Sequence, residues 1–277
     1  MNKTKYIFFG TPTFAALILK RLIASGITPV AVVTNPDRPL GRKKIITTPP
    51  IKTYIMNQAV GIRDQITVVQ PEDLKTITHE LKDLHPEIGI VAAYGKIIPH
   101  EIIDVFPRGI VATHPSLLPH YRGATPIQST LLNGDAETGT TVFLMDEKMD
   151  HGPIIGYKKV GIMYDDTYET LLIKLAEASA DVLIEILPRF MRGDIILKAQ
   201  DEAQATYTKK LIGTDGFADL QKDVPEKIGR MVRALNPEPG VWCVHNGRRM
   251  KILEADVIDG KLVLKKIQFD GEKPRAA

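Results

Sequence analysis

The chain has 277 residues, of which 44% are hydrophobic and 25% are charged, with a formal net charge of +3 at pH 7. That is enough material for one large domain and a small one, with a full apolar core. The single cysteine, Cys243, excludes an internal disulfide, and no apolar run approaches the roughly 20 residues that span a bilayer. The N-terminus lacks the apolar stretch of a secretory signal, so we expect a cytoplasmic protein without membrane contact.

The first hundred residues predict a doubly wound α/β fold with a mostly parallel sheet. Short apolar runs at 6–9, 29–33, 66–69 and 88–93 are typical of buried strands. Residues 14–22 have helical apolar spacing after a turn at Gly10, which gives the strand-turn-helix opening of such a fold. A further helix is expected to begin within 71–74. The three spaced glycines of a dinucleotide site are absent, so NAD is not supported.

A basic segment follows the second predicted strand. Residues 35–44 contain two prolines and a glycine, which exclude a regular helix, together with the cations Arg38, Arg42, Lys43 and Lys44. A mobile basic loop of this kind can meet phosphates as it orders on binding. The alternative is a solvated loop without a partner.

The stretch 109–155 carries the candidate chemistry. A strand is expected to end at 110–112, with His114 directly after it, and a helix follows over 125–132. A second strand, 139–145, leads into a loop that contains Asp150. Because strand ends converge on the ligand crevice of an open α/β sheet, His114 and Asp150 are expected to face each other as a general-base or electrophile pair.

The last part of the chain predicts a small, basic, β-rich domain. After a long helix over 165–187, residues 196–209 form a linker, which places the domain boundary between 1–200 and 206–277. A helix at 224–235 precedes three strand-like runs, 241–244, 250–257 and 262–267, joined by Asn-Gly and Asp-Gly turns. Residues 206–277 carry 14 Lys and Arg against 10 Asp and Glu. This excess suits a polyanion such as RNA, although a solvated basic face would have the same composition.

Several long motifs resemble one enzyme family. The segments HPSLLPHYRGATPIQ and GDAETGTTVFLMDEKMDHGPI are similar to those of formyltransferases that use 10-formyltetrahydrofolate, above all those that act on methionyl-tRNA. FFGTPTFA, NPDRPLGRKK, VVQPEDL, VAAYGKIIP, ATYTKKL and RALNPEPG resemble family segments in the same order. The resemblance covers nearly the whole chain. It implies a Rossmann-like catalytic domain and a C-terminal open barrel of the oligonucleotide-binding type, here too short for five complete strands.

The resemblance also implies a reaction and its residues. The chain would transfer a formyl group from 10-formyltetrahydrofolate to the amino group of methionyl-initiator-tRNA, in the service of translation initiation. His114 and Asp150 would be catalytic, and the basic loop and residues 206–277 would bind tRNA. No metal is expected, because the histidines and Cys243 lack the spacing of metal ligands. The folate crevice would be lined by residues from two strand ends: Tyr94, Gly95, Ser116, Leu117, Leu118 and Pro119.

One position departs from the family pattern. The family has an asparagine two residues before the histidine, and this chain has Ala112. Losing an oxyanion donor of this kind typically lowers turnover about 100- to 1000-fold. Three explanations are open: an inactivating substitution, which the intact surrounding motif favours; a paralogue that binds folate or RNA without efficient catalysis; or a water or neighbour that replaces the amide. A further alternative is a formyltransferase acting on an amino sugar nucleotide, which would need no basic loop or basic tail.

Overall fold

The computed structural model describes residues 4–41 and 43–277, and these form two compact units. The first unit comprises Met1–Pro119, Gly139–Val160 and Ile173–Ala205. The second comprises His120–Thr138, Gly161–Leu172 and Thr206–Ala277. The C-terminal part of the chain is therefore packed with two segments from its middle. None of the described helices combines the length and apolar character needed to cross a bilayer.

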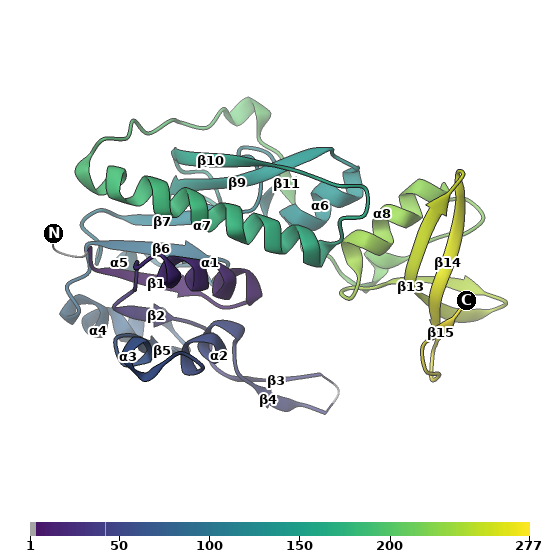
Figure 1. The fold of residues 1–277 in the computed structure, drawn as a ribbon, viewed down its shortest axis with the longest axis horizontal. Coiled ribbons are helices and arrows are strands. Elements are labelled where there is room, and N and C mark those ends of the chain that lie inside the picture. The colour runs from purple at the N-terminus through teal and green to yellow at the C-terminus, as the bar shows by residue number, and fades with distance from the viewer. Residues whose placement is uncertain (1–3, 42) are drawn as a thin grey trace. The chain divides into compact units, whose positions relative to one another are not determined.

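Within the described residues, the first unit is built on a seven-stranded sheet with the order β10-β9-β7-β6-β1-β2-β5 (Figure 1). The five strands β5, β2, β1, β6 and β7 pair in parallel, and β9 pairs antiparallel with β7. This confirms the expected mostly parallel sheet, with the apolar run of β6 at its centre. The strands are β1 (Tyr6–Gly10), β2 (Ala31–Val33), β5 (Thr67–Val69), β6 (Ile88–Ala92), β7 (Ile110–His114), β9 (Glu137–Leu144) and β10 (Ile154–Gly161).

Helices cover both faces of this sheet (Figure 1). The long helix α7 (Tyr168–Arg192) and α1 (Thr13–Ala24) lie on one face, and Arg21 of α1 pairs with Asp181 of α7 at 2.7 Å. The other face is covered by shorter elements: η1 (Leu74–Ile77), α4 (Thr78–Asp83) and α5 (His100–Ile103). The remaining helices of this unit are α2 (Pro50–Met56), α3 (Val60–Arg63) and η2 (Glu202–Gln204).

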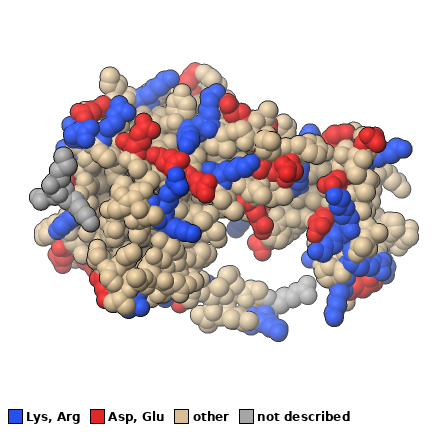
Figure 2. All heavy atoms as spheres, viewed as in Figure 1, with Lys and Arg blue, Asp and Glu red and all other residues tan. Residues whose placement is uncertain are grey.

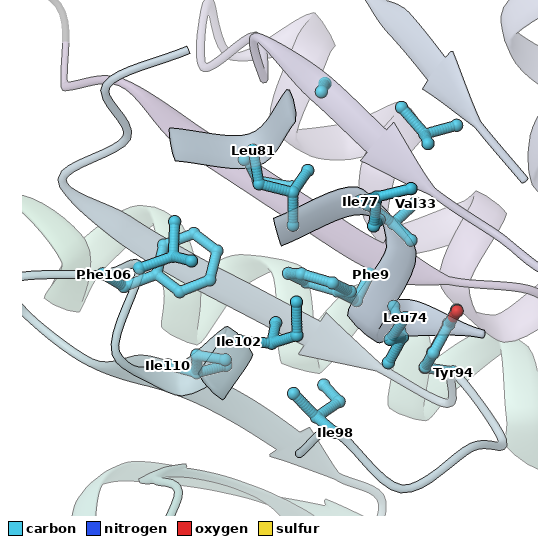
Figure 3. Close-up of a cluster of buried hydrophobic side chains, with 14 residues drawn as sticks. Phe9, Val33, Leu74, Ile77, Leu81, Tyr94, Ile98, Ile102, Phe106 and Ile110 are labelled. Carbon is cyan, nitrogen blue, oxygen red and sulfur yellow. The ribbon is translucent and has the colours of Figure 1, made fainter. Parts of the chain in front are cut away.

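The core beneath α4 and α5 explains why β1 is apolar at every position. All five β1 residues are buried, as expected for a central parallel strand with helices on both faces. Phe9 meets the rings of Tyr94 and Phe106 edge-on at 5.8 and 5.9 Å (Figure 3). Such aromatic pairs contribute about 0.5–1.5 kcal/mol beyond their buried area, so this cluster fixes the segment that follows β6.

The basic segment differs from the expected loop, because it forms a β-hairpin. β3 (Arg38–Leu40) pairs antiparallel with β4 (Ile45–Thr47), and the hairpin extends away from the sheet (Figure 1). Gly41 and Lys44 have φ of +68° and +47°, which allow the tight reversal. Prolines exclude a helix but not an edge strand, since Pro39 does not have to donate to a sheet ladder here.

The second unit contains an antiparallel sheet packed on a helix. Its strand order is β12-β13-β14-β15, from β12 (Val241–His245), β13 (Arg248–Ile258), β14 (Lys261–Phe269) and β15 (Arg275–Ala276). Helix α8 (Pro225–Leu235) buries Ile228, Met231 and Leu235. The two expected hairpin turns are present, with positive φ at Asn246 and Asp259. The other elements of this unit are β8 (Arg122–Gly123), α6 (Pro126–Asn133), β11 (Tyr207–Thr208) and η3 (Gly213–Gly216).

Two local expectations were wrong. The helix start at 71–74 was expected to have Pro71 at an early helical position, but η1 begins only at Leu74, because the Asp73 side chain accepts the Lys75 N–H at 3.0 Å and caps it there. The segment 196–209 is not a featureless linker, because Lys198 pairs with Ile154 and Tyr207 with Arg122. Backbone hydrogen bonds to distant partners hold it, and those partners leave no periodic signal in the segment itself.

Candidate active site

His114 and Ala112 lie on the same side of β7, near its carboxyl end. Both side chains are buried, with 5% and 6% exposure. β7 runs through His114, two residues beyond the strand end that the sequence predicted, and residues i and i+2 of a strand share a face. Ala112 packs on Leu118 and Phe143, with Val91, Met145 and Ile154 around them. These apolar neighbours carry no side-chain donor that could replace an amide at position 112.

Asp150 faces His114 from the loop between β9 and β10. Its Oδ2 lies 3.6 Å from Nδ1 of His114. The residue has a left-handed backbone with φ of +50°, which aspartate tolerates better than most residues. Gly152 makes the tight loop possible, because an added Cβ would lie 1.8 Å from the carbonyl oxygen of Leu144. The loop therefore delivers a carboxylate to the imidazole, as the sequence predicted.

A second segment holds this loop from outside. The Nε2 group of Gln200 donates to the carbonyl oxygens of Asp150 and Gly152, at 2.9 and 2.8 Å. His151 contacts two carboxylates, Asp146 at 2.5 Å and Glu202 at 3.4 Å. Sequence reasoning missed Gln200 and His151, because neither belongs to a pattern with the catalytic pair. Gln200 lies within the segment 196–209, which the sequence predicted to be a linker without a role in the site.

The residues expected to line a folate crevice from the 116–119 segment lie directly beside His114. Ser116 is fully buried, and its carbonyl accepts from the Thr141 hydroxyl at 2.7 Å. The same hydroxyl accepts the Leu118 N–H at 3.0 Å, which ties the segment to β9. Leu118 packs on Ala112, and Leu117 lies against Gly139, where an added Cβ would meet its Cδ2 at 2.5 Å. Pro119 is partly exposed at the end of the segment.

Tyr94 and Gly95 lie after β6, but the Tyr94 ring points into the apolar core (Figure 3). Burial raises the pKa of Tyr94 to about 12, and its hydroxyl has no hydrogen-bond partner among the described atoms. Its carbonyl accepts from Thr11 at 3.1 Å and from Asn35 at 3.2 Å. Gly95 has φ of +83° and follows directly. These two residues thus shape the turn after β6 through backbone contacts.

The basic hairpin is anchored at its base and exposed at its tip. Asp37 accepts from Gln70 at 2.8 Å and from Lys52 at 3.1 Å, and these contacts lower its pKa. Arg38 forms an ion pair with Glu72. Lys43 and Lys44 are exposed at the turn, and Arg42 lies outside the described residues. Leu40, Ile45 and Ile46 are about 60% exposed as well, so the hairpin has an apolar surface besides its cations.

A second group of cations and aromatic rings lies on the C-terminal sheet. The guanidinium of Arg249 lies 4.2 Å from the Trp242 ring centre, and those of Arg248 and Arg275 lie 4.7 and 5.3 Å from Phe269. Figure 2 shows Lys and Arg side chains, with carboxylates among them, over these strands. Phe269 is buried and Trp242 half-buried, so the arginines rather than the rings face solvent, and exposed arginines of this kind can contact the backbone of a nucleic acid.

Comparison with known proteins matches the sequence of this chain to one family. The Formyl transferase family model matches residues 3–187, and the model of the formyl transferase C-terminal domain matches 210–266. The chain belongs to the formyl transferase family. A methionyl-tRNA formyltransferase of Dictyoglomus thermophilum is 40% identical over 271 residues, which cover 94% of this chain and 84% of that protein.

Two solved structures share the fold of this chain. Methionyl-tRNA formyltransferase from Clostridium thermocellum superimposes with a TM-score of 0.66 and 16% identity, over 96% of this chain and 98% of that one. HypX from Aquifex aeolicus in complex with tetrahydrofolic acid gives 0.68 and 15%, over 99% of this chain and 46% of that one. At these identities the likeness shows the fold alone. Within the described residues, no group of three His, Cys, Asp or Glu is arranged to hold a metal ion.

Proposed function

We propose that this chain transfers the formyl group of 10-formyltetrahydrofolate to the amino group of methionyl-initiator-tRNA. The observation that carries the proposal is the 40% identity to a methionyl-tRNA formyltransferase over 94% of the chain. Buried His114 and half-buried Asp150, which face each other, supply the chemistry that acyl transfer to an amine requires. Residues 1–200 are the proposed catalytic domain and 206–277 the proposed tRNA-binding domain.

In the proposed reaction, the methionyl amine attacks the formyl carbon, a C–N bond forms, and the bond to the folate nitrogen breaks. The formyl oxygen carries negative charge in between, so a donor aimed at it lowers the barrier. With its Nδ1–H toward Asp150, neutral His114 can accept the amine proton at Nε2, and the resulting imidazolium can donate from Nε2 to the formyl oxygen. The same pair can carry the proton from the attacking amine to the leaving nitrogen.

In this proposal, different structural elements contact folate and tRNA. Ser116, Leu117, Leu118 and Pro119 form the wall beside His114 on which the folate ring system would lie, with Tyr94 and Gly95 shaping the neighbouring turn. Arg38, Arg42, Lys43 and Lys44 of the hairpin would contact phosphates or bases at the acceptor end of the tRNA. The exposed cations explain why we prefer tRNA to an amino sugar nucleotide, since the smaller acceptor has no chain of phosphates to meet them.

Ala112 favours a second candidate, a protein that binds folate and tRNA but turns over slowly. The methyl group of Ala112 cannot donate to the oxyanion, and the apolar side chains packed on it cannot do so either. On this basis we propose that formyl transfer by this chain is weakened. Binding of both substrates would be retained, because an oxyanion donor acts mainly on charge that develops in the transition state.

The test is an assay of the purified chain with 10-formyltetrahydrofolate and either methionyl-initiator-tRNA or an amino sugar nucleotide. The proposal predicts formyl-methionine on the tRNA and no formylated sugar. Equilibrium binding of the same tRNA separates the two candidates. Tight binding without transfer would support the slow or non-catalytic protein, and absence of both would refute the proposed function.

A further inference from the structure

The second unit contains a cavity of about 780 Å³ that the proposed reaction does not use. Every residue that lines it belongs to this unit. Helix α8 supplies Arg230 and Arg233, and alternate residues of β13, namely Leu253, Ala255 and Val257, supply an apolar strip. The volume lies in the range of roughly 300–1,000 Å³ that is usual for sites of small molecules.

Arg230 is the unusual residue of this cavity. Its Nε is buried without a hydrogen-bond partner, and among the described residues no carboxylate forms an ion pair with it. The side chain packs on Gly134, the left-handed residue that ends α6, where an added Cβ would meet its Cδ at 3.0 Å. Because the Nε is covered by protein, an anion in the cavity would be met by the terminal nitrogens of the guanidinium, whose positive charge has no ion-pair partner among the described residues.

Arg233 lies one turn further along the same face of α8. It donates to the carbonyl oxygen of Asp166 at 3.1 Å, and its guanidinium lies 5.5 Å from the Tyr164 ring centre. Burial lowers the pKa of Arg233, and the neighbouring Arg230 acts in the same direction. Two guanidinium groups of like charge are thus held near each other and partly withdrawn from water, where a shared anion would relieve their repulsion.

The carboxylates that line the cavity limit the size of the anion that can enter it. Asp256 and Glu254 are in ion pairs with Lys265 and Lys266 of the next strand. Asp135 is half-buried and accepts from the Tyr121 hydroxyl, whereas Asp165, Glu169 and Glu226 line the cavity with exposed side chains. An acidic rim repels a long polyanion such as an RNA backbone, whereas one compact anion can pass it and reach the arginines.

We propose that this cavity binds a small phosphorylated molecule. Its phosphate accepts from Arg230 and Arg233, whose planar guanidinium groups match phosphate oxygens in pairs. Its apolar body lies along Leu253, Ala255 and Val257. The site is separate from His114 and Asp150 and does not depend on formyl transfer.

The test is a calorimetric titration of the full chain with uridine 5′-monophosphate and with inorganic phosphate, while the Nε–H signal of Arg230 is followed by NMR. The nucleotide should bind, shift this signal, and bind more tightly than inorganic phosphate, which lacks an apolar body. Arg230→Gln should weaken nucleotide binding roughly tenfold or more, since it removes charge-assisted hydrogen bonds. The matched control, Arg192→Gln, removes an exposed arginine that pairs with Asp194 outside the cavity and should leave binding unchanged.

Several results would overturn the proposal. They are no nucleotide binding by the parent chain, equal binding of nucleotide and inorganic phosphate, or equal losses in Arg230→Gln and Arg192→Gln. A loss of tRNA affinity in Arg230→Gln as large as the loss of nucleotide affinity would mean that the arginines read an RNA backbone instead. Arg230→Lys controls for misfolding in Arg230→Gln. It keeps the positive charge at this position, so it should retain part of the nucleotide binding. These titrations need no methionyl-tRNA, so their outcome is independent of the proposed function.

Discussion

At the scale of single residues, the proposed catalytic role of His114 depends on the negative charge of Asp150. Asp150→Asn keeps the side-chain shape and tolerates the left-handed backbone equally well, so it removes the charge and little else. In a chain that carries Ala112→Asn, we expect this change to slow formyl transfer about 100-fold or more, as loss of general acid–base assistance does. Steady-state rates with methionyl-tRNA measure it. Asp194→Asn, which removes an exposed carboxylate paired with Arg192, is the control and should have no effect.

The carboxyl of Asp37 should become protonated only at an unusually low pH, and its contacts at the base of the hairpin should be lost at the same pH. Hydrogen bonds from Gln70 and Lys52 favour its charged form and lower its pKa. A lowered pKa in the folded state means that the stabilisation is complete above the ordinary value of about 3.9 and is lost as the pH falls through the folded value. An NMR titration should show the signals of Gln70 and Lys52 changing with Asp37, below pH 3.9. A midpoint at or above the ordinary value would contradict this account.

At the scale of elements, the segment around Gln200 positions the loop that carries Asp150. Gln200 bonds two carbonyl oxygens on either side of His151, and Lys198 pairs with Ile154 just beyond the loop. Gln200→Ala should therefore lower kcat for formyl transfer about tenfold, with the KM for tRNA little changed, because a loop that shifts by about an ångström misplaces the carboxylate. Gln204→Ala is a matched control, since Gln204 bonds only the exposed Asp201. Equal effects of the two changes would refute a positioning role.

The elements differ in how well the sequence predicts them, for physical reasons. β1, β6 and β7 are buried on both faces, so their composition alone marks them as strands. The juxtaposition of His114 and Asp150 was predictable because both residues lie next to strand ends that converge in an open α/β sheet. β10 was missed, since its outward residues 157–159 are exposed and polar or aromatic, which hides the strand pattern. The β3–β4 hairpin was missed because three-residue strands without a buried face have no periodic signal.

At the scale of the whole molecule, the C-terminal residues cannot be treated as a removable domain. Residues 206–277 form one compact unit with 120–138 and 161–172, and Arg122, fully buried, donates to the Tyr207 hydroxyl at 3.0 Å. Deleting 206–277 would leave this arginine buried without that acceptor, which is costly. Substitution on the exposed sheet is therefore the better test of the proposed tRNA-binding role.

Arg249 and Lys251 are suitable positions for that test, because they lie on β13 beside Trp242 and neither supports the core. Replacing both by glutamine should weaken tRNA binding and reduce the slope of log affinity against log salt by about 1 to 2, as expected for lost phosphate contacts. Folate affinity should not change. An unchanged slope would show that the C-terminal sheet is not a surface for tRNA.

The most direct test of the whole account is the rate of formyl transfer from 10-formyltetrahydrofolate to methionyl-initiator-tRNA, measured for this chain and for its Ala112→Asn variant. The side chain at 112 shares a strand face with His114, so the new amide would reach the same crevice. We expect kcat to rise roughly 100-fold or more, the inverse of losing an oxyanion donor, with folate affinity little changed. A variant no faster than the parent chain would contradict the account, because it would mean that catalysis is not organised around residues 112, 114 and 150.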